Sequence, residues 1–199
     1  MKTRFLEPDE ISRLLDQPKL DTLTGLRNRC IMQTQIESGL RIGEVVSLGV
    51  RDIVIADKRI EVLHGKGDKQ RTCYYRSSEL SLLIEKWKKV RPTSPYLFCA
   101  VRTANKGKML DPNGYRYTFA NYVKEAGLPE WARKTHILRH TFATNLTRAG
   151  TPLPIVAHSL GHSSVATSTR YIHCTQEDVK RAVQRTDNGL EATVLQALG

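Results

Sequence analysis

The sequence from Thr135 to Tyr171 reads THILRHTFATNLTRAGTPLPIVAHSLGHSSVATSTRY. Its apolar residues recur at the three- and four-residue spacing of helices, and glycines stand at positions 150 and 161. A glycine directly after the last periodic residue commonly ends a helix, because glycine adopts the left-handed conformation without strain. The stretch therefore predicts helices over residues 137–149 and 152–160, followed by a short third helix that ends near residue 170.

The same stretch carries basic groups and a phenol that suit chemistry on a phosphodiester. His136 and Arg139 are three residues apart near a helix start, so their side chains can face the same way. His162 follows a glycine that can turn its imidazole toward the same place. Tyr171 is a poor nucleophile at its ordinary pKa of about 10, but neighbouring cations favour the phenolate. Each residue alone also fits a structural role, so the hypothesis rests on their joint spacing.

Upstream, the sequence predicts three helices and places an arginine where two of them meet. Apolar periodicity favours helices over residues 7–15 and 23–38, and a glycine stands where the second should end. The next helix is expected from about residue 42 to residue 48, which leaves Arg41 at the junction. Arginine grips phosphate well because its planar fork gives two parallel charge-assisted hydrogen bonds. Arg41 and Arg139 are therefore the candidate phosphate clamps.

Short β-branched runs over residues 52–56, 59–64 and 70–75 predict a three-stranded antiparallel sheet. Its second connection, Gly65-Lys66-Gly67-Asp68-Lys69, is rich in glycine and lysine and can bring a cation close to a ligand. On these residues alone, an ordinary exposed hairpin turn is the preferred interpretation.

The remaining elements are mostly helical. Helical spacing covers residues 79–90, 112–126 and 176–185, and residues 96–98 permit a brief strand. Residues 101–111 predict a surface loop whose cations either face solvent or contact phosphate, and these are Arg102, Lys106 and Lys108. The expected fold class is α+β, mostly helical with one small antiparallel sheet.

The chain has 199 residues and a formal net charge of +11. At this length one compact domain is the expectation. Basic and acidic residues balance over residues 1–65, so all the excess positive charge lies in residues 66–199. This asymmetry favours a polyanionic partner, and nucleic acid is a commoner one than a membrane. A basic surface without such a partner would have the same net charge.

The four cysteines are scattered, with neither zinc-site spacing nor a disulfide framework, which indicates reduced thiols. No continuous apolar leader is visible, and no run approaches the roughly 20 apolar residues of a membrane span. These features predict a soluble cytoplasmic protein without a metal site.

Taken together, the motifs resemble the catalytic domain of the tyrosine recombinases, the phage-integrase and Xer-like family. The resemblance runs through SGLRIGE from Ser38, GKG from Gly65, HILRHTFAT from His136, LGHSS from Leu160 and YIH from Tyr171. Order and spacing agree over roughly residues 5–185, and we expect the catalytic domain to cover residues 1–185. The resemblance implies the tyrosine-recombinase catalytic fold.

The resemblance also implies a role for each motif residue. The arginines would clamp the phosphate, Lys66 would protonate the leaving 5′-oxygen, and the histidines would assist the transition state and proton transfer. Tyr171 would form a 3′-phosphotyrosyl link, without a metal, ATP or another cofactor. The catalytic set is then Arg41, Lys66, His136, Arg139, His162 and Tyr171, and Lys69 is a nearby rival for Lys66. Further DNA contacts are expected from Lys69, Arg71, Arg102, Lys106 and Lys108.

The function expected from the resemblance is site-specific recombination or integration of double-stranded DNA. The family implies a homotetramer in the synaptic complex and a monomer when free. Residues 186–199 would form a tail that docks on a neighbouring protomer or covers its own chain. Family members usually carry an N-terminal DNA-clasping domain, the core-binding domain. We expect this domain to be absent here, which would make the chain either an excised fragment, the favoured interpretation, or a minimal natural protein.

Two alternatives remain open at this point. One is a DNA-relaxing enzyme like the type IB topoisomerases, which shares the chemistry. The other is a noncatalytic DNA-binding regulatory module of the same fold, and the complete set of six residues argues against it because a degenerate copy should have lost at least one.

Overall fold

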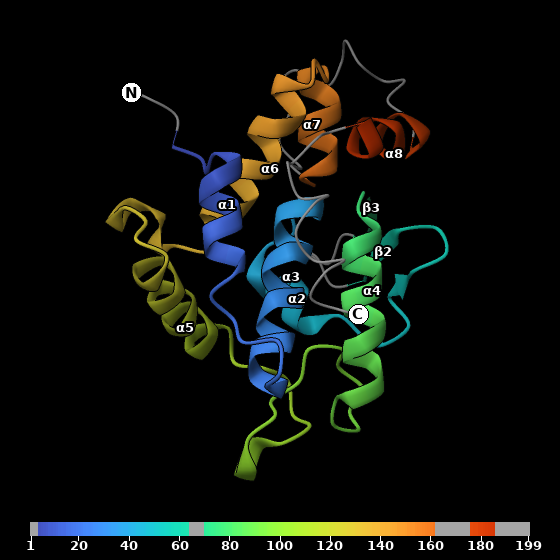
Figure 1. Cartoon of the computed structure of the whole chain (residues 1–199). Helices are drawn as coiled ribbons and strands as arrows, with labels where there is room; N and C mark the ends of the chain where they lie inside the picture. The colour runs from blue at the N-terminus through green and yellow to red at the C-terminus, as the bar shows by residue number, and fades with distance from the viewer. Residues whose placement is uncertain (1–3, 64–69, 162–175, 186–199) are drawn as a thin grey trace.

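The computed structural model describes residues 4–63, 70–161 and 176–185. Helices form most of this part of the chain, and a small sheet lies beside them (Figure 1). The helices are α1 (Pro8–Leu15), α2 (Leu23–Ser38), α3 (Ile42–Ser47), α4 (Ser78–Val90), α5 (Pro112–Glu125), α6 (His136–Arg148), α7 (Leu153–Ser159) and α8 (Gln176–Arg185), with the short 3-10 helices η1 (Thr103–Asn105) and η2 (Glu130–Arg133). Within the described ranges, no helix is long and apolar enough to cross a bilayer. The arrangement confirms the expected α+β class.

Helix α2 is the centre of the fold, with α1 and α4 on either side of it (Figure 1). After its first two residues, every residue of α2 is buried, including charged ones. Arg29 donates to the carbonyl of Leu15 (2.5 Å) and to Oε1 of Glu79 (2.7 Å). Glu37 accepts from the backbone N–H (2.9 Å) and the hydroxyl (2.6 Å) of Ser77. Buried charges need such partners in place of water, so these contacts fix α1 and α4 against α2.

The sheet consists of β1 (Ile53–Val54), β2 (Arg59–Val62) and β3 (Arg71–Tyr74), which pair antiparallel in that order. Ile60 and Cys73 are cross-strand partners and both are buried, so one face of the sheet packs on the core. The strands are shorter than the sequence predicted. The first hairpin turns at Lys58, whose φ of +49° is incompatible with a continuing strand.

The strand permitted over residues 96–98 is not formed. Tyr96 and Cys99 make only isolated bridges, to Gly49 and Met109. Pro92 and Pro95 precede this segment, and proline supplies no N–H for a ladder. The segment is therefore held by single bridges rather than by a sheet.

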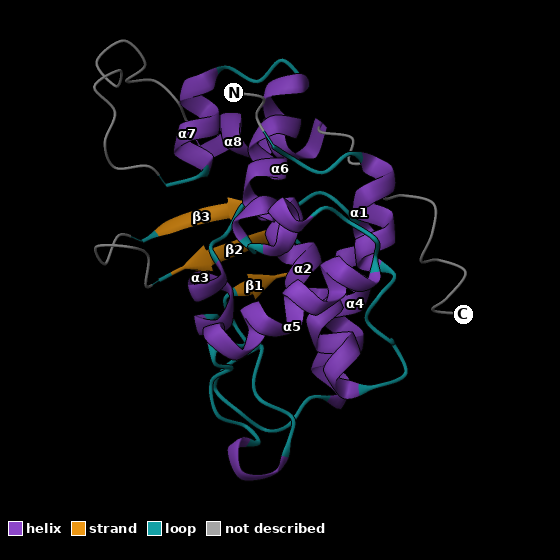
Figure 2. Cartoon of the chain, turned by 90° about the vertical axis from the view of Figure 1, so that its left-hand side faces the viewer, coloured by secondary structure: helices purple, strands orange, loops and turns teal. Residues whose placement is uncertain are grey.

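Helix α6 joins two clusters of buried side chains. Leu138 belongs to the main core, whereas a second cluster on α6, α7 and α8 contains Phe142, Leu146, Val156, Leu160, Val179 and Val183. Helix α8 lies against both α7 and β3. Helices α6, α7 and α8 thus form one end of the molecule, above the sheet (Figures 1 and 2). The predicted helix that ends near residue 170 lies outside the described residues.

The residues before α1 hold α6 from the other side. The buried backbone N–H of Leu6 donates to Oγ1 of Thr141 (3.0 Å). Glu7 accepts from Nη1 (2.9 Å) and Nη2 (3.1 Å) of Arg148 at the end of the same helix. Helix α6 is thus fixed along its length, which matters because its first turn carries two of the predicted site residues.

Candidate active site

Arg139 lies in the first turn of α6 and is 6% exposed. Its Nη1 donates to the carbonyl of Gly39 (2.6 Å) and its Nη2 to the carbonyl of Leu160 (2.5 Å). These carbonyls lie just beyond the ends of α2 and α7, where helices leave acceptors unsatisfied. The guanidinium group is therefore held in one orientation by backbone atoms of two distant segments.

The first of these acceptors, the carbonyl of Gly39, belongs to a position that requires glycine. Gly39 ends α2 with φ of +68°, in the left-handed region that favours glycine. A Cβ at this position would lie 2.4 Å from Cδ1 of Phe142, so a side chain is excluded by space as well as by backbone conformation. The close approach of α2 and α6 at Gly39 brings Arg139 next to the start of α3.

Arg41 stands directly before α3 and is bound to Glu44, the third residue of that helix. The backbone N–H of Arg41 donates to Oε2 of Glu44 (2.8 Å), and its Nη1 lies 3.3 Å from Oε1. Arg71, at the start of β3, donates from both terminal nitrogens to the two carboxylate oxygens, each at 2.9 Å. Burial alone would raise the pKa of Glu44, but the hydrogen bonds from Arg71 and Arg41 outweigh it and lower the pKa.

The three arginines leave the site with excess positive charge. Burial lowers the pKa of Arg139 to about 10, and repulsion from Arg41 and Arg71 adds to the effect, while Glu44 opposes it. This lowered pKa still lies well above 7, so the Arg139 guanidinium keeps its charge at neutral pH. Among the described residues, three guanidinium groups gather around one carboxylate, that of Glu44. Such an excess of positive charge favours binding of an anion, and a phosphodiester supplies one negative charge with two nonbridging oxygens.

His136 is exposed at the first position of α6, three residues before Arg139. Desolvation lowers its pKa below the usual 6.5, and the charges of Arg139, His140 and Arg41 lower it further. The imidazole is consequently neutral at pH 7, and a neutral imidazole can both donate and accept a hydrogen bond. The structure thus brings Arg41, His136 and Arg139 together at one place, and their catalytic roles stay predictions.

The other predicted residues fall into three groups. Lys66, Lys69, His162 and Tyr171 lie outside the described residues. Arg71 lies at the site but is bound to Glu44. Arg102, Lys106 and Lys108 lie on or beside the loop that carries η1, which is at the opposite end of the molecule from α6 and α7 (Figures 1 and 2). Their expected contacts with DNA stay predictions.

Sequence reasoning missed Glu44 as a functional residue. The sequence did contain a signal, because an acid three residues after a helix-capping position often reaches back to the cap N–H. Arg41 and Glu44 have that spacing, and the Glu44 carboxylate accepts from the backbone N–H of Arg41 at the start of α3. The carbonyls of Gly39 and Leu160 had no signal in the sequence, because any residue carries a carbonyl.

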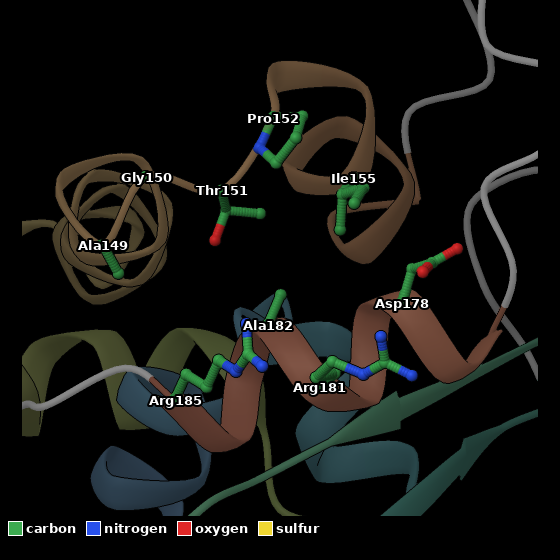
Figure 3. A pocket seen from close by; sticks show the side chains of 9 residues that line it. All are labelled: Ala149, Gly150, Thr151, Pro152, Ile155, Asp178, Arg181, Ala182 and Arg185. Atoms are coloured by element: carbon green, nitrogen blue, oxygen red, sulfur yellow. The ribbon is translucent and has the colours of Figure 1, made fainter.

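A separate pocket of about 230 Å³ opens between the α6–α7 turn and α8 (Figure 3). Its lining residues are Ala149, Gly150, Thr151, Pro152, Ile155, Asp178, Arg181, Ala182 and Arg185. None of the predicted site residues is among them. Across the described ranges, no group of three or more histidine, cysteine or acidic side chains is placed to hold a metal ion.

Comparison with known proteins gives consistent matches. A model of the phage integrase family matches residues 4–178. The tyrosine recombinase XerC of Staphylococcus saprophyticus is 32% identical over 182 residues, which cover 89% of this chain and 59% of that protein. The tyrosine recombinase XerA of Pyrococcus furiosus is 31% identical over 184 residues, which cover 92% of this chain and 62% of that protein. The chain thus spans about three fifths of the length of these relatives.

Solved structures agree on the fold. The crystal structure of XerA recombinase superposes with a TM-score of 0.71 at 27% identity, covering 91% of this chain and 64% of that one. XerH site-specific recombinase, in a post-cleavage complex with its palindromic difH substrate, gives a TM-score of 0.68 at 28% identity and covers 89% of this chain and 51% of that one. The integrase of mycobacterium phage Brujita has a TM-score of 0.72 at 18% identity and covers 100% of this chain and 63% of that one, a likeness of fold alone.

Proposed function

The chain belongs to the phage integrase family and is a tyrosine-recombinase catalytic domain, and on that premise we propose that it cleaves and rejoins DNA strands at specific sites. The observation that carries the proposal is Arg139, a buried guanidinium held by two backbone carbonyls beside Arg41. Such a preorganised cation stabilises the charge that develops on phosphate in the transition state.

In the proposed reaction, the phenol oxygen of Tyr171 attacks the phosphorus and the bond from phosphorus to the 5′-oxygen breaks. Arg41 and Arg139 bind the nonbridging oxygens. Lys66 gives a proton to the leaving 5′-oxygen, while His162 accepts the phenol proton. His136 is neutral at pH 7 and hydrogen-bonds the phosphate. Rejoining is the reverse reaction with the 5′-hydroxyl of another strand.

The reaction needs no energy source or cofactor in this proposal. Cleavage exchanges one phosphodiester for a phosphotyrosyl diester, so the bond energy is kept and the step is reversible. The arginines supply the charge stabilisation that phosphoryl transfer requires. This is consistent with the excess positive charge at the site.

The proposed partner is double-stranded DNA, bound by a homotetramer that forms from free monomers at synapsis. Residues 186–199, which lie outside the described residues, are the segment proposed to dock on a neighbouring protomer. We place the activity in the cytoplasm, because Cys30, Cys73 and Cys99 are buried free thiols of the kind found in reducing compartments.

A covalent-trapping experiment tests the proposal. Wild-type chain is mixed with a nicked duplex from which the cleaved 5′ fragment diffuses away, and a denaturing gel reports the protein–DNA adduct. Tyr171→Phe should bind the same duplex with unchanged affinity and form no adduct, because only the nucleophilic oxygen is removed. An undiminished adduct in this variant would disprove the assignment of Tyr171. Binding without any wild-type adduct would favour the noncatalytic alternative.

A further inference from the structure

Arg71 differs from Arg41 and Arg139 in that a carboxylate binds both of its terminal nitrogens. Its side chain is 13% exposed, and both terminal nitrogens are bound to Glu44 at 2.9 Å. A bidentate pair of this kind is the strongest geometry available to arginine and carboxylate. Burial alone would lower the pKa of Arg71, but hydrogen bonding to Glu44 outweighs it and raises the pKa. Two of its five N–H donors are therefore committed to Glu44, and the fork geometry holds the guanidinium group on that carboxylate.

Arg71 also supports the turn that follows α7. Gly161 has φ of +64°, and a Cβ built on it would lie 2.9 Å from both Cδ and Nε of Arg71. The backbone of Gly161 thus packs directly against the side chain of Arg71. In the sequence, Gly161 is followed by His162, and Arg71 comes five residues after Lys66. The Arg71 side chain thus touches the residue directly before His162, while Arg71 itself stands five positions after Lys66 in the sequence.

The contacts of Glu44 divide unequally between the two arginines. Arg71 occupies both carboxylate oxygens at 2.9 Å, whereas the side chain of Arg41 reaches only one of them, at 3.3 Å. Within the described part of the chain, Glu44 is the only side-chain partner of Arg41. Most donors of Arg41 are consequently available, and its side chain is 27% exposed.

We propose that Arg71 is a positioning residue that satisfies Glu44 and so leaves Arg41 free to bind the phosphate, a role that rests on the proposed function. Without Arg71, the buried carboxylate of Glu44 loses its closest cation. A buried charge without a partner is costly, so Glu44 then draws in the nearest remaining guanidinium, that of Arg41. Arg41 becomes paired with Glu44 and can no longer bind the phosphate.

The test compares Arg71→Ala with the double variant Arg71→Ala/Glu44→Gln. Single-turnover adduct formation is measured with the nicked duplex in excess, and duplex affinity is measured over a salt series. Arg71→Ala should lower the maximal rate by on the order of 100-fold, the effect of a misplaced catalytic group. The double variant should recover at least about tenfold of that loss, because glutamine has no charge to capture Arg41 and still accepts from the Arg41 N–H.

The salt series separates this role from a direct phosphate contact. If Arg71 positions Arg41, Arg71→Ala withdraws Arg41 from the phosphate, so the slope of log affinity against log salt falls by about 0.9 and returns to the wild-type value in the double variant. If Arg71 itself binds a phosphate, the slope falls by about 0.9 in both variants. Arg59→Ala is the matched control, since Arg59 lies in the same sheet, 42% exposed, and pairs with Asp57 and Glu61. It should keep the wild-type rate.

The outcomes are distinguishable. A slope reduced by about 0.9 without rescue in the double variant would overturn the proposal and make Arg71 a phosphate ligand. If wild type itself forms no adduct, the proposed function fails first. If Arg71→Ala does not fold at the assay temperature, Arg71→Met with and without Glu44→Gln gives the same comparison, because methionine fills much of the same space but carries no charge for Glu44. Equal rates in that pair would also refute the proposal.

Discussion

Arg139 has a structural role in the fold and a proposed role in catalysis. Its two terminal nitrogens bind carbonyls that are 100 and 21 positions away in the sequence. A lysine at this position has a single ammonium group and cannot span both carbonyls in the same plane. The consequences of that change are therefore measurable in two independent ways.

We expect Arg139→Lys to slow adduct formation by on the order of 100-fold or more, as when one preorganised donor is removed. It should also lower the free energy of unfolding by about 1–3 kcal/mol, because one buried carbonyl loses its donor. Urea unfolding and single-turnover trapping measure the two effects. Arg133→Lys is the control, since Arg133 is paired with the exposed Glu130 on a short 3-10 helix. A variant that keeps the wild-type rate would contradict the role of Arg139 as a clamp.

His136 gives a prediction about pH. The pKa of His136 is 6.5 in the unfolded chain and lower in the folded protein. At a pH between the folded and the unfolded pKa, the unfolded chain therefore holds more protons at this residue than the folded one. Stability should therefore be fully present above the unfolded pKa and be lost as the pH falls through the folded one. An NMR titration of the imidazole protons should give a midpoint below 6.5. His136→Gln assigns the signal and should lose less stability on acidification, and a midpoint above 6.5 would contradict the prediction.

At the scale of the elements, the ends of the helices were predictable from the sequence, but the burial of charged residues within them was not. Gly39, Gly150 and Gly161 end helices with positive φ, as their positions in the sequence indicated. Helix α2, by contrast, buries Arg29 and Glu37, which a one-sided apolar pattern would place at the surface. Such burial depends on partners from α1 and α4, and periodicity along one segment contains no information about them.

The candidate site was predictable to a similar degree. The spacing of His136 and Arg139 follows from helical geometry alone, so their common location could be predicted. The bond from Arg139 to Gly39 and the pairing of Arg71 with Glu44 join segments far apart in the sequence. A single sequence does not show which distant residues pair with each other. The charge of Arg71 therefore suggested a DNA contact, and its pairing with Glu44 was not predicted.

The hairpin between β2 and β3 gives a prediction at the same scale. Lys66 is the proposed acid, so Lys66→Ala should cleave normal DNA very slowly, by on the order of 100-fold or more. The rate should recover on a duplex whose leaving 5′-oxygen is replaced by sulfur, because a thiolate leaves without protonation. Lys69→Ala serves as the control, with no sulfur rescue expected. Rescue in Lys69→Ala instead would assign the acid to the other lysine.

At the scale of the whole molecule, the cations of interest are spread along its length. Arg139 lies in α6 and Arg41 directly before α3, whereas the loop with η1, which carries Arg102, is at the end far from α6 (Figures 1 and 2). For both regions to contact one duplex, the duplex has to run along the face between them. The excess positive charge of residues 66–199 allows such binding without any base-specific contact.

Binding across a salt series tests this arrangement. The 199-residue chain should bind duplex DNA weakly and lose affinity steeply with added salt, because phosphate contacts release counterions. It should discriminate poorly between a specific and a scrambled duplex, since phosphates carry no sequence information. The triple variant Arg102→Ala/Lys106→Ala/Lys108→Ala should reduce the slope by about 0.9 for each phosphate that these side chains neutralise, equally on both duplexes.

The same measurement can go against the prediction in two ways. An unchanged slope in the triple variant would show that the far loop stays in solvent and that the duplex is bound only at the end near α6. Tight, salt-insensitive and site-selective binding by the wild type would contradict the electrostatic account altogether. In that case base-edge contacts dominate the affinity, because hydrogen bonds to bases distinguish sequences and release few counterions. The slope therefore decides whether charge or base contact binds this chain to DNA.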